Sequence, residues 1–135
     1  GQRGVGFSRA NLFGKNFEEY KEEAQSPIIV AQIENIRAVT VLEQILAVSG
    51  LDAILIGPYD LSASMGLTGQ FEALEYTKVL EKIKTLSLQF NIPFGIHVVQ
   101  PDLNELKARI LAGFQFIAYS IDSVFLYNGA ECPKF

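Results

Sequence analysis

Short apolar runs alternate along the chain with longer stretches in which apolar residues recur at helical spacing. The apolar runs, each expected to be a β-strand, are residues 27–33, 53–57, 94–99 and 114–119. The helical stretches between them are residues 35–48, residues 73–90 and the segment from Asp102 to Gly113. Runs that are apolar throughout, rather than alternating, are typical of parallel strands in a sheet covered on both faces. The pattern predicts an α/β fold of parallel (β/α) units.

Local signals mark where these helices begin and end. Gly50 suits the position just after the first helix, and Pro93 blocks continuation of the second. Asp102 and Glu105 have the spacing of a capping box, and Gly113 ends that helix. Residues 16–24 predict one more helix before the first strand run. We expect that helix to follow a strand that these residues do not include.

Composition and charge narrow the class of protein. The chain has 135 residues, 49% of them hydrophobic, and a formal net charge of −4. These values predict one globular domain over residues 1–135 and argue against disorder and against nucleic-acid binding. No apolar stretch approaches the roughly 20 residues of a membrane helix, so we expect a cytoplasmic protein. The single cysteine, Cys132, is expected to be a free thiol.

Candidate chemistry lies where the predicted strands end. In parallel α/β folds the working groups lie on the loops that follow the carboxyl ends of the strands. This rule selects Gln32, Glu34, the turn Gly57–Asp60, His97, Ser120 and Asp122.

Glu34 and Asp60 are carboxylates at equivalent positions after neighbouring strands. Adjacent strands lie about 4.8 Å apart, so the two side chains can converge. Two hard oxygen ligands without clustered His or Cys suit Mg²⁺ or Mn²⁺. The alternative is that Glu34 solvates a helix start and that Asp60 caps the next helix. His97 is the single histidine, and a lone histidine is more often an ordinary hydrogen-bonded side chain than a catalyst.

Three consecutive segments give a more specific indication. GQRGVGFSRANLFG, VAQIEN and LDAILIGPYDLSASMGLTGQ, in this order and spacing, resemble signatures of the HpcH/HpaI aldolases, which are metal-dependent (class II) pyruvate aldolases. The similarity continues through NIPFGI and the SID segment. The resemblance implies a TIM (β/α)₈ barrel of which this chain is the C-terminal half, strands five to eight. It also implies cleavage of a 4-hydroxy-2-oxo acid to pyruvate and an aldehyde.

The resemblance assigns roles residue by residue. Glu34 and Asp60 match the family's metal-binding carboxylates, and Gln32 matches a glutamine of the substrate pocket. The backbone N–H groups of Tyr59 and Asp60 match those that receive the pyruvate carboxylate. A Mg²⁺ or Mn²⁺ cofactor would act as Lewis acid toward the bound 2-oxo acid. His97 falls where relatives often have an apolar residue facing the aldehyde portion, so we expect it to influence the choice of aldehyde.

The resemblance also defines what this chain is expected to lack. The family's catalytic histidine and substrate-binding arginine come from the first half of the barrel, so no catalytic residue is identified here. Arg3 is not that arginine and is expected to order a loop at the barrel mouth. Two alternatives stay open: a non-catalytic half-barrel fragment that self-associates, and a citrate-lyase-like acyl-cleaving subunit.

Half a barrel should also expose apolar surface. We expect about half of a set of strand residues to point into the barrel interior without opposing strands: Ile29, Ala31, Ile54, Ile56, Phe94 and Ile96. The open sheet edges favour further pairing. The chain is therefore expected to form a homo-oligomer or to associate with the missing half of the barrel.

Overall fold

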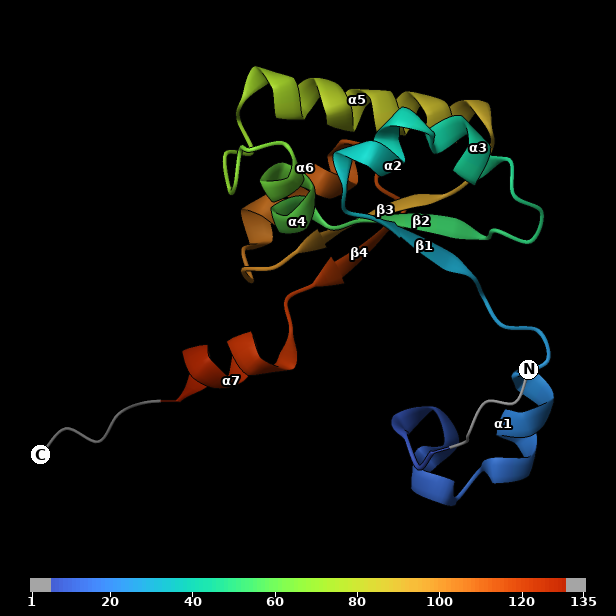
Figure 1. The fold of residues 1–135 in the computed structure, drawn as a ribbon. Helices are drawn as coiled ribbons and strands as arrows, with labels where there is room; N and C mark the ends of the chain where they lie inside the picture. The colour runs from blue at the N-terminus through green and yellow to red at the C-terminus, as the bar shows by residue number, and fades with distance from the viewer. Residues whose placement is uncertain (1–5, 131–135) are drawn as a thin grey trace, which may run out of the picture.

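The computed structural model of the chain describes residues 6–130 and contains one four-stranded sheet with helices between its strands (Figure 1). Arg3 and Cys132 lie outside the described residues, so their expected roles stay predictions. The strands are β1 (Val30–Ile33), β2 (Ala53–Ile56), β3 (Phe94–Val98) and β4 (Phe116–Tyr119). All three pairings are parallel, and the strands follow one another in sequence order. The predicted α/β class and parallel (β/α) units are confirmed.

The helices and one 3₁₀ segment occupy the connections and the two ends of the described chain. They are η1 (Arg9–Gly14), α1 (Phe17–Glu23), α2 (Ile36–Thr40), α3 (Leu42–Leu46), α4 (Pro58–Ser64), α5 (Leu74–Gln89), α6 (Leu103–Leu111) and α7 (Asp122–Gly129). Helices α2, α3 and α5 lie on one side of the sheet, whereas α1 and α7 lie away from it on the other side (Figure 1).

The core lies between the sheet and its helical layer. Paired positions of the strands supply a row of buried isoleucines, in which Ile33, Ile56 and Ile96 are at most 1% exposed. Leu42 of α3 and Ile83 of α5 are buried in the same cluster. Because side chains alternate along a strand, the residues directly before and after each of these isoleucines in its strand face away from the helices.

The residues on the second face of the sheet differ from those expected to point into the barrel interior. Ile54, Ile56, Phe94 and Ile96 are at most 2% exposed and belong to the helix-side core, so they do not point into a barrel interior. The register places a different row on the opposite face: Gln32, Leu55, Gly95 and Phe116. We call this row and its continuation at Glu34, Gly57 and His97 the open face. Its large apolar side chains, which include Leu55 and Phe116, are not among the residues predicted to point into the barrel interior.

The observed limits of β1 and of the helix that follows it differ from the predicted ones. The helix expected over residues 35–48 is divided into α2 and α3 at Val41, whose φ of −115° and ψ of 21° are not helical. Gly50 adopts a φ of +86° in the turn before β2, four residues beyond the end of α3, and so does not end that helix. The strand expected from residue 27 is paired only from Val30, and Ile28 is 80% exposed.

The ends of α6 largely follow the predicted signals. Asp102 Oδ1 accepts hydrogen bonds from the N–H groups of Asn104 and Glu105, at 2.7 and 3.0 Å. Glu105 does not complete the capping box, because its carboxylate pairs with Arg109 instead. Gly113, with a φ of +89°, follows the helix, and the N–H of Phe114 reaches the carbonyl of Arg109. This arrangement is a Schellman motif, for which glycine is the preferred residue.

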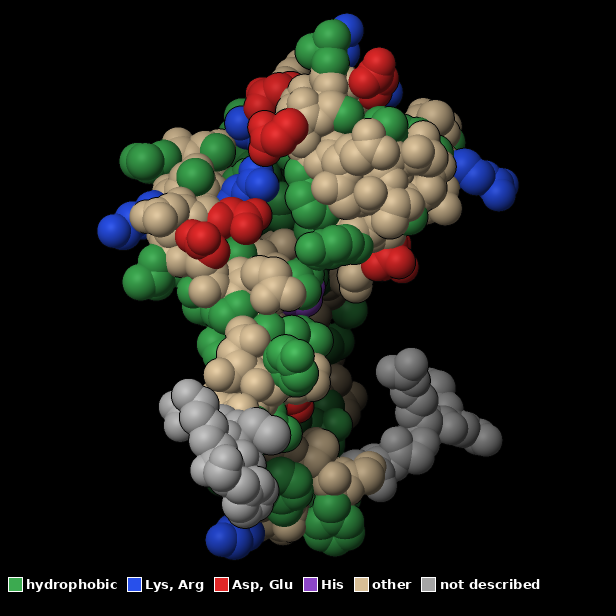
Figure 2. Space-filling view, turned by 90° about the vertical axis from the view of Figure 1, so that its left-hand side faces the viewer, with side chains coloured by type: hydrophobic (Ala, Val, Ile, Leu, Met, Phe, Trp, Pro, Cys, Tyr) green, Lys and Arg blue, Asp and Glu red, His purple; other side chains and the backbone are tan. Residues whose placement is uncertain are grey.

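Charged side chains gather over the upper, helical part of the molecule, and hydrophobic side chains are frequent below it (Figure 2). Among residues 6–130, no helix has both the length and the apolar character needed to cross a membrane.

Candidate active site

The carboxyl end of β1 brings Glu34 beside the start of α4. The N–H of Gly57 donates to the carbonyl of Ile33 at 3.1 Å, so Glu34 lies next to Gly57 across the strand pair. Gln32, two residues earlier on the same face, donates through Nε2 to Glu34 Oε2 at 2.9 Å. This hydrogen bond orients one carboxylate oxygen and leaves the other oxygen open to a ligand. The structure thus brings the predicted pair Gln32 and Glu34 into direct contact.

Gly57 is required by the close approach of these side chains. A Cβ built on Gly57 would lie 3.1 Å from Gln32 Nε2 and 3.1 Å from Glu34 Cβ. It would also lie 3.4 Å from Glu34 Oε2. A side chain at residue 57 would therefore press on the hydrogen-bonded pair. The sequence predicts Gly57 in a turn, but its contact with Glu34 depends on strand register.

Asp60 does not lie at the position equivalent to Glu34. The register places Gly57 beside Glu34, and Asp60 follows three residues later in the first turn of α4. Gly57 is the N-cap residue and Pro58 the first helical residue, so Asp60 does not cap the helix either. Its carboxylate is exposed in the first turn of α4.

The start of α4 also presents backbone donors. The first N–H to enter the helical hydrogen-bond pattern is that of Leu61, which donates to the carbonyl of Gly57 at 2.9 Å. Pro58 has no N–H, so the N–H groups of Tyr59 and Asp60 lack a carbonyl partner within the helix. These are the two donors that the resemblance assigns to a substrate carboxylate.

His97 lies within β3, on the open face, and contacts the end of the neighbouring strand. Its Nε2 lies 3.2 Å from the carbonyl oxygen of Ser120. Ser120 has a φ of +60°, in the left-handed region, and its buried Oγ has no hydrogen-bond partner within the described residues. The predicted residues His97 and Ser120 are therefore neighbours. Asp122 is not part of this group, because its Oδ1 accepts from the N–H of Ser123 at the start of α7.

The donor set is compatible with an open site for a hard divalent cation. Residues 6–130 contain no group of three or more His, Cys, Asp or Glu side chains that could hold a metal ion. Mg²⁺ does not need such a group, because it commonly takes one or two carboxylates and keeps several waters or substrate oxygens. Glu34 and Asp60, both exposed at the same end of the sheet, meet that lower requirement.

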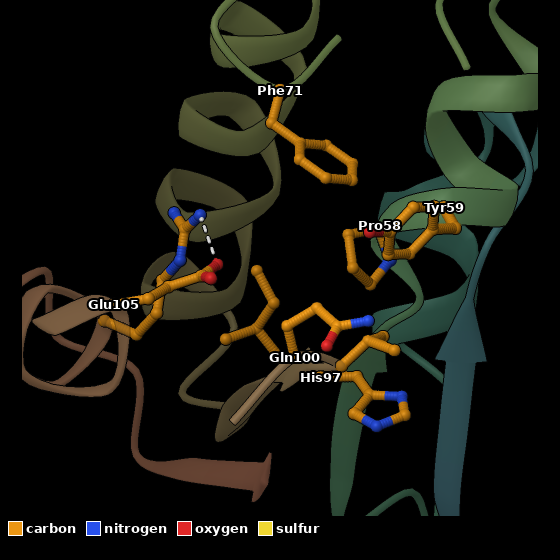
Figure 3. Close-up of a pocket in the computed structure, with 9 residues that line it drawn as sticks. Pro58, Tyr59, Phe71, His97, Gln100 and Glu105 are labelled. Carbon is orange, nitrogen blue, oxygen red and sulfur yellow. Dashed lines mark hydrogen bonds and ion pairs between the residues drawn. The ribbon is translucent and has the colours of Figure 1, made fainter. Parts of the chain in front are cut away.

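A small cavity opens beside these residues, between the start of α4 and α6 (Figure 3). Its volume is about 50 Å³. Tyr59 lies on one side and Glu105 on the other, with Phe71 above and Gln100 and His97 below (Figure 3). Arg109 also lines it and pairs with Glu105 at 3.2 Å. Of these residues, only Tyr59 and His97 are site residues predicted from the sequence.

A buried tyrosine lies near this ion pair. Tyr76 of α5 is 1% exposed, and its hydroxyl has no hydrogen-bond partner within the described residues. Burial raises the pKa of Tyr76 to about 12, with a lowering contribution from Arg109 and a raising one from Glu105. The phenol therefore remains protonated and can act as a hydrogen-bond donor.

Comparison with known proteins shows which family the chain resembles. The model of the HpcH/HpaI aldolase/citrate lyase family matches residues 6–129. The chain belongs to this family. The predicted family resemblance is thus confirmed.

Two curated relatives of the chain are named aldolases. The chain is 37% identical over 133 residues to 4-hydroxy-2-oxovalerate aldolase of Novosphingobium aromaticivorans, covering 96% of this chain and 49% of that protein. It is 35% identical to hydroxypyruvate/pyruvate aldolase of Roseobacter denitrificans, covering 95% and 50% of the two chains. The crystal structure of a family protein from Burkholderia cenocepacia superposes with a TM-score of 0.73 at 28% identity, over 95% of this chain and 49% of that one. The chain thus spans about half the length of these relatives, which confirms a half-length TIM-barrel-like fold.

Proposed function

We propose that this chain provides the metal-binding and pyruvate-binding half of a class II aldolase that cleaves 4-hydroxy-2-oxo acids to pyruvate and an aldehyde. The observation that carries the proposal is the contact of Glu34 with Gln32 and Gly57 at the start of α4. This contact puts the Glu34 carboxylate next to the residue that begins α4, and the N–H groups of Tyr59 and Asp60 in that helix have no backbone acceptor within the described residues. The names of the two curated relatives, 4-hydroxy-2-oxovalerate aldolase and hydroxypyruvate/pyruvate aldolase, support the same reaction type.

Each side chain then has a defined task. Glu34 and Asp60 would hold Mg²⁺ or Mn²⁺, which when bound supplies Lewis acidity toward the 2-oxo group of the substrate. Gln32 keeps the Glu34 carboxylate oriented, as outer partners of ligating carboxylates do. The N–H groups of Tyr59 and Asp60 would receive the carboxylate of the pyruvate half. His97, on the same open face, would contact the aldehyde half.

Acid–base catalysis is expected to come from outside these residues. By family resemblance, a histidine and an arginine of the other barrel half complete the site. The edges of β1 and β4 each have an unpaired side within the described residues, as sheet edges open to further strands do. We therefore expect a second copy of the chain, or the missing half of the barrel, to pair there. The proposed partner would thus extend the sheet and also supply the residues for acid–base catalysis.

The metal part of the proposal is tested by calorimetric titration of the 135-residue chain with Mn²⁺ and Mg²⁺. Asp60→Asn and Glu34→Gln should each raise the Kd at least about tenfold, since each removes one of two anionic ligands. Glu75→Gln, an exposed carboxylate in the first turn of α5, is the matched control and should leave the Kd unchanged. Equal affinities in the wild type and Asp60→Asn would exclude Asp60 from the site.

The catalytic part is tested by measuring pyruvate release from a 4-hydroxy-2-oxo acid together with hydrodynamic mass. Activity is expected only in a species larger than the 14.9 kDa monomer. A monodisperse monomer that cleaves the substrate would contradict the need for a partner. A stable oligomer that binds Mn²⁺ but releases no pyruvate would instead support the non-catalytic alternative.

A further inference from the structure

Glu34 lies in a loop that is joined to α4 on both sides of it. On one side, the N–H of Gly57 at the start of α4 donates to the carbonyl of Ile33 at 3.1 Å. On the other side, the N–H of Ile36 donates to the hydroxyl oxygen of Ser64, the last residue of α4, at 2.8 Å. These two cross-links limit how far the Glu34 backbone can move relative to α4.

The two cross-links are connected to each other by hydrogen bonds within α4. The N–H of Leu61 donates to the carbonyl of Gly57 at 2.9 Å, and the Ser64 hydroxyl donates to the carbonyl of Leu61 at 2.7 Å. The side chain of Leu61 is fully buried in the core, which anchors this part of the helix. Hydrogen bonds that follow one another in such a chain strengthen each other. Asp60 lies next to Leu61, on the helical segment that the hydrogen-bond chain spans.

Ser64 supplies the side chain in this hydrogen-bond chain, whose other members are backbone groups. The second serine of α4, Ser62, forms hydrogen bonds of a similar kind in another direction. Its hydroxyl donates to the carbonyl of Tyr59 at 2.9 Å and accepts from the N–H of Gly69 at 3.1 Å. Ser62 therefore joins α4 to the loop that follows it, whereas Ser64 joins α4 to the loop of Glu34.

The simpler interpretation is that Ser64 only caps α2. Ile36 is the first residue of α2, so its N–H has no acceptor within that helix. Asn35, the N-cap residue, satisfies another donor of the same turn, because its Oδ1 accepts from the N–H of Arg37 at 3.0 Å. Both side chains stabilise the start of α2, but Asn35 belongs to that start and Ser64 comes from a different helix. Asn35 is therefore the control that separates capping from cross-linking.

We propose that Ser64 is a positioning residue whose hydroxyl holds the Glu34 loop against α4 and so sets the spacing of Glu34 and Asp60. The inference rests on the proposed metal site for its ligand, but not for the cross-link itself. Ligands that are held in place before binding lose less conformational freedom when the cation binds. Loss of the Ser64 hydroxyl should therefore weaken cation binding although both carboxylates remain.

The cross-link is tested first without metal, by amide hydrogen exchange of the 135-residue chain followed by NMR. Ser64→Ala should speed the exchange of the Ile36 N–H and also of the Gly57 N–H, at the far end of the hydrogen-bond chain. The expected factor is about two- to tenfold, which corresponds to one hydrogen bond. Asn35→Ala should leave the Gly57 N–H unchanged. Faster exchange confined to Ile36 in Ser64→Ala would show that Ser64 only caps α2 and would overturn the proposal.

Cation binding is tested next by calorimetric titration with Mn²⁺. Ser64→Ala should raise the Kd roughly three- to tenfold, which is less than the loss of a direct partner of a ligating group can cause. Ser64→Thr keeps a hydroxyl that can bond within a helix and should restore the wild-type Kd. Asn35→Ala removes a cap from the same helix, so it should lower the urea midpoint of unfolding while leaving the Kd unchanged.

The two measurements separate this inference from the aldolase proposal. Equal Mn²⁺ affinity in the wild type and Ser64→Ala would overturn the positioning role and leave the metal site standing. An equal rise in Kd in Ser64→Ala and Asn35→Ala would assign the effect to the stability of α2 and would also overturn it. Faster Gly57 exchange in Ser64→Ala, in a chain that binds no Mn²⁺, would contradict the proposed metal site and support the cross-link.

Discussion

The two faces of the sheet differ in what they contain and in what they do. The helix-side face places Ile33, Ile56 and Ile96 in a closed core, each at most 1% exposed. The open face places Gln32, Glu34 and His97 along the same strands, one residue out of phase. Alternation along a strand therefore separates the residues that stabilise the half-barrel from those proposed to bind substrate. The comparison indicates that substitutions on the two faces should affect different measurements.

The largest expected effect is on the helix-side face. Ile56→Ala should lower the free energy of unfolding by about 2–5 kcal/mol, because it leaves a cavity in the closed core. Leu55→Ala, one residue earlier on the open face, should cost about 1 kcal/mol. Urea unfolding of both variants measures the difference. Equal losses would show that the open face is also buried in solution, for example by a second copy of the chain.

The second effect tests close contact on the open face. A Cβ on Gly95 would lie 2.5 Å from the ring of Phe116, so Gly95→Ala should destabilise the chain by about 1–3 kcal/mol. In a Phe116→Leu background the penalty should be smaller, because the smaller side chain can move aside. A double-mutant cycle from urea unfolding gives the coupling. An unchanged penalty in that background would mean that Phe116 is not its cause.

The third effect depends on pH and concerns a side chain of the helical layer. Burial raises the pKa of Tyr76 from 10.0 to about 12, so above pH 10 the unfolded state loses this proton first. The unfolded state then binds fewer protons, and stability should fall with a slope of at most about 1.4 kcal/mol per pH unit up to pH 12. Tyr76→Phe should remove that part of the slope. Tyr59→Phe, at an exposed tyrosine, should retain it; a retained slope in Tyr76→Phe would contradict the assignment.

The smallest effect is at the end of β4, beside His97. Ser120 has a φ of +60°, so Ser120→Gly should relieve backbone strain and raise the free energy of unfolding by up to about 1 kcal/mol. Ser123→Gly in α7 is the control and should lower it, because glycine disfavours helix interiors. Thermal unfolding compares the two variants. Loss of stability in Ser120→Gly would show that the serine side chain contributes more than its strain costs.

Hydrophobic periodicity was sufficient to predict elements whose stability is local. The helix expected over residues 73–90 is observed as α5, Leu74–Gln89, because its buried face and Pro93 both lie within the local sequence. The first strand and helix were less well predicted, because their limits depend on partners. Ile28 precedes the β1–β2 pairing, and the helix after β1 is interrupted at Val41.

The site was predicted in part for a similar reason. The rule for strand ends selected Gln32, Glu34 and His97, which the structure places on one face. It could not show that Glu34 lies beside Gly57 rather than Asp60, because that is a matter of register. Nor could it find Arg109 and Tyr76, which come from two helices and come near one another only after packing. The one signal in the sequence for this part of the site was Arg109, an arginine that is partly buried in α6.

The order of the strands has a consequence for how the chain acquires its structure. Every strand pairs with the strand that precedes or follows it in the sequence, and no connection skips a neighbour among the described strands. Each new βα unit can therefore dock on a surface formed by residues already synthesised, which keeps the loops that must close short. We expect folding to advance from β1 to β4 in the direction of translation, one unit at a time.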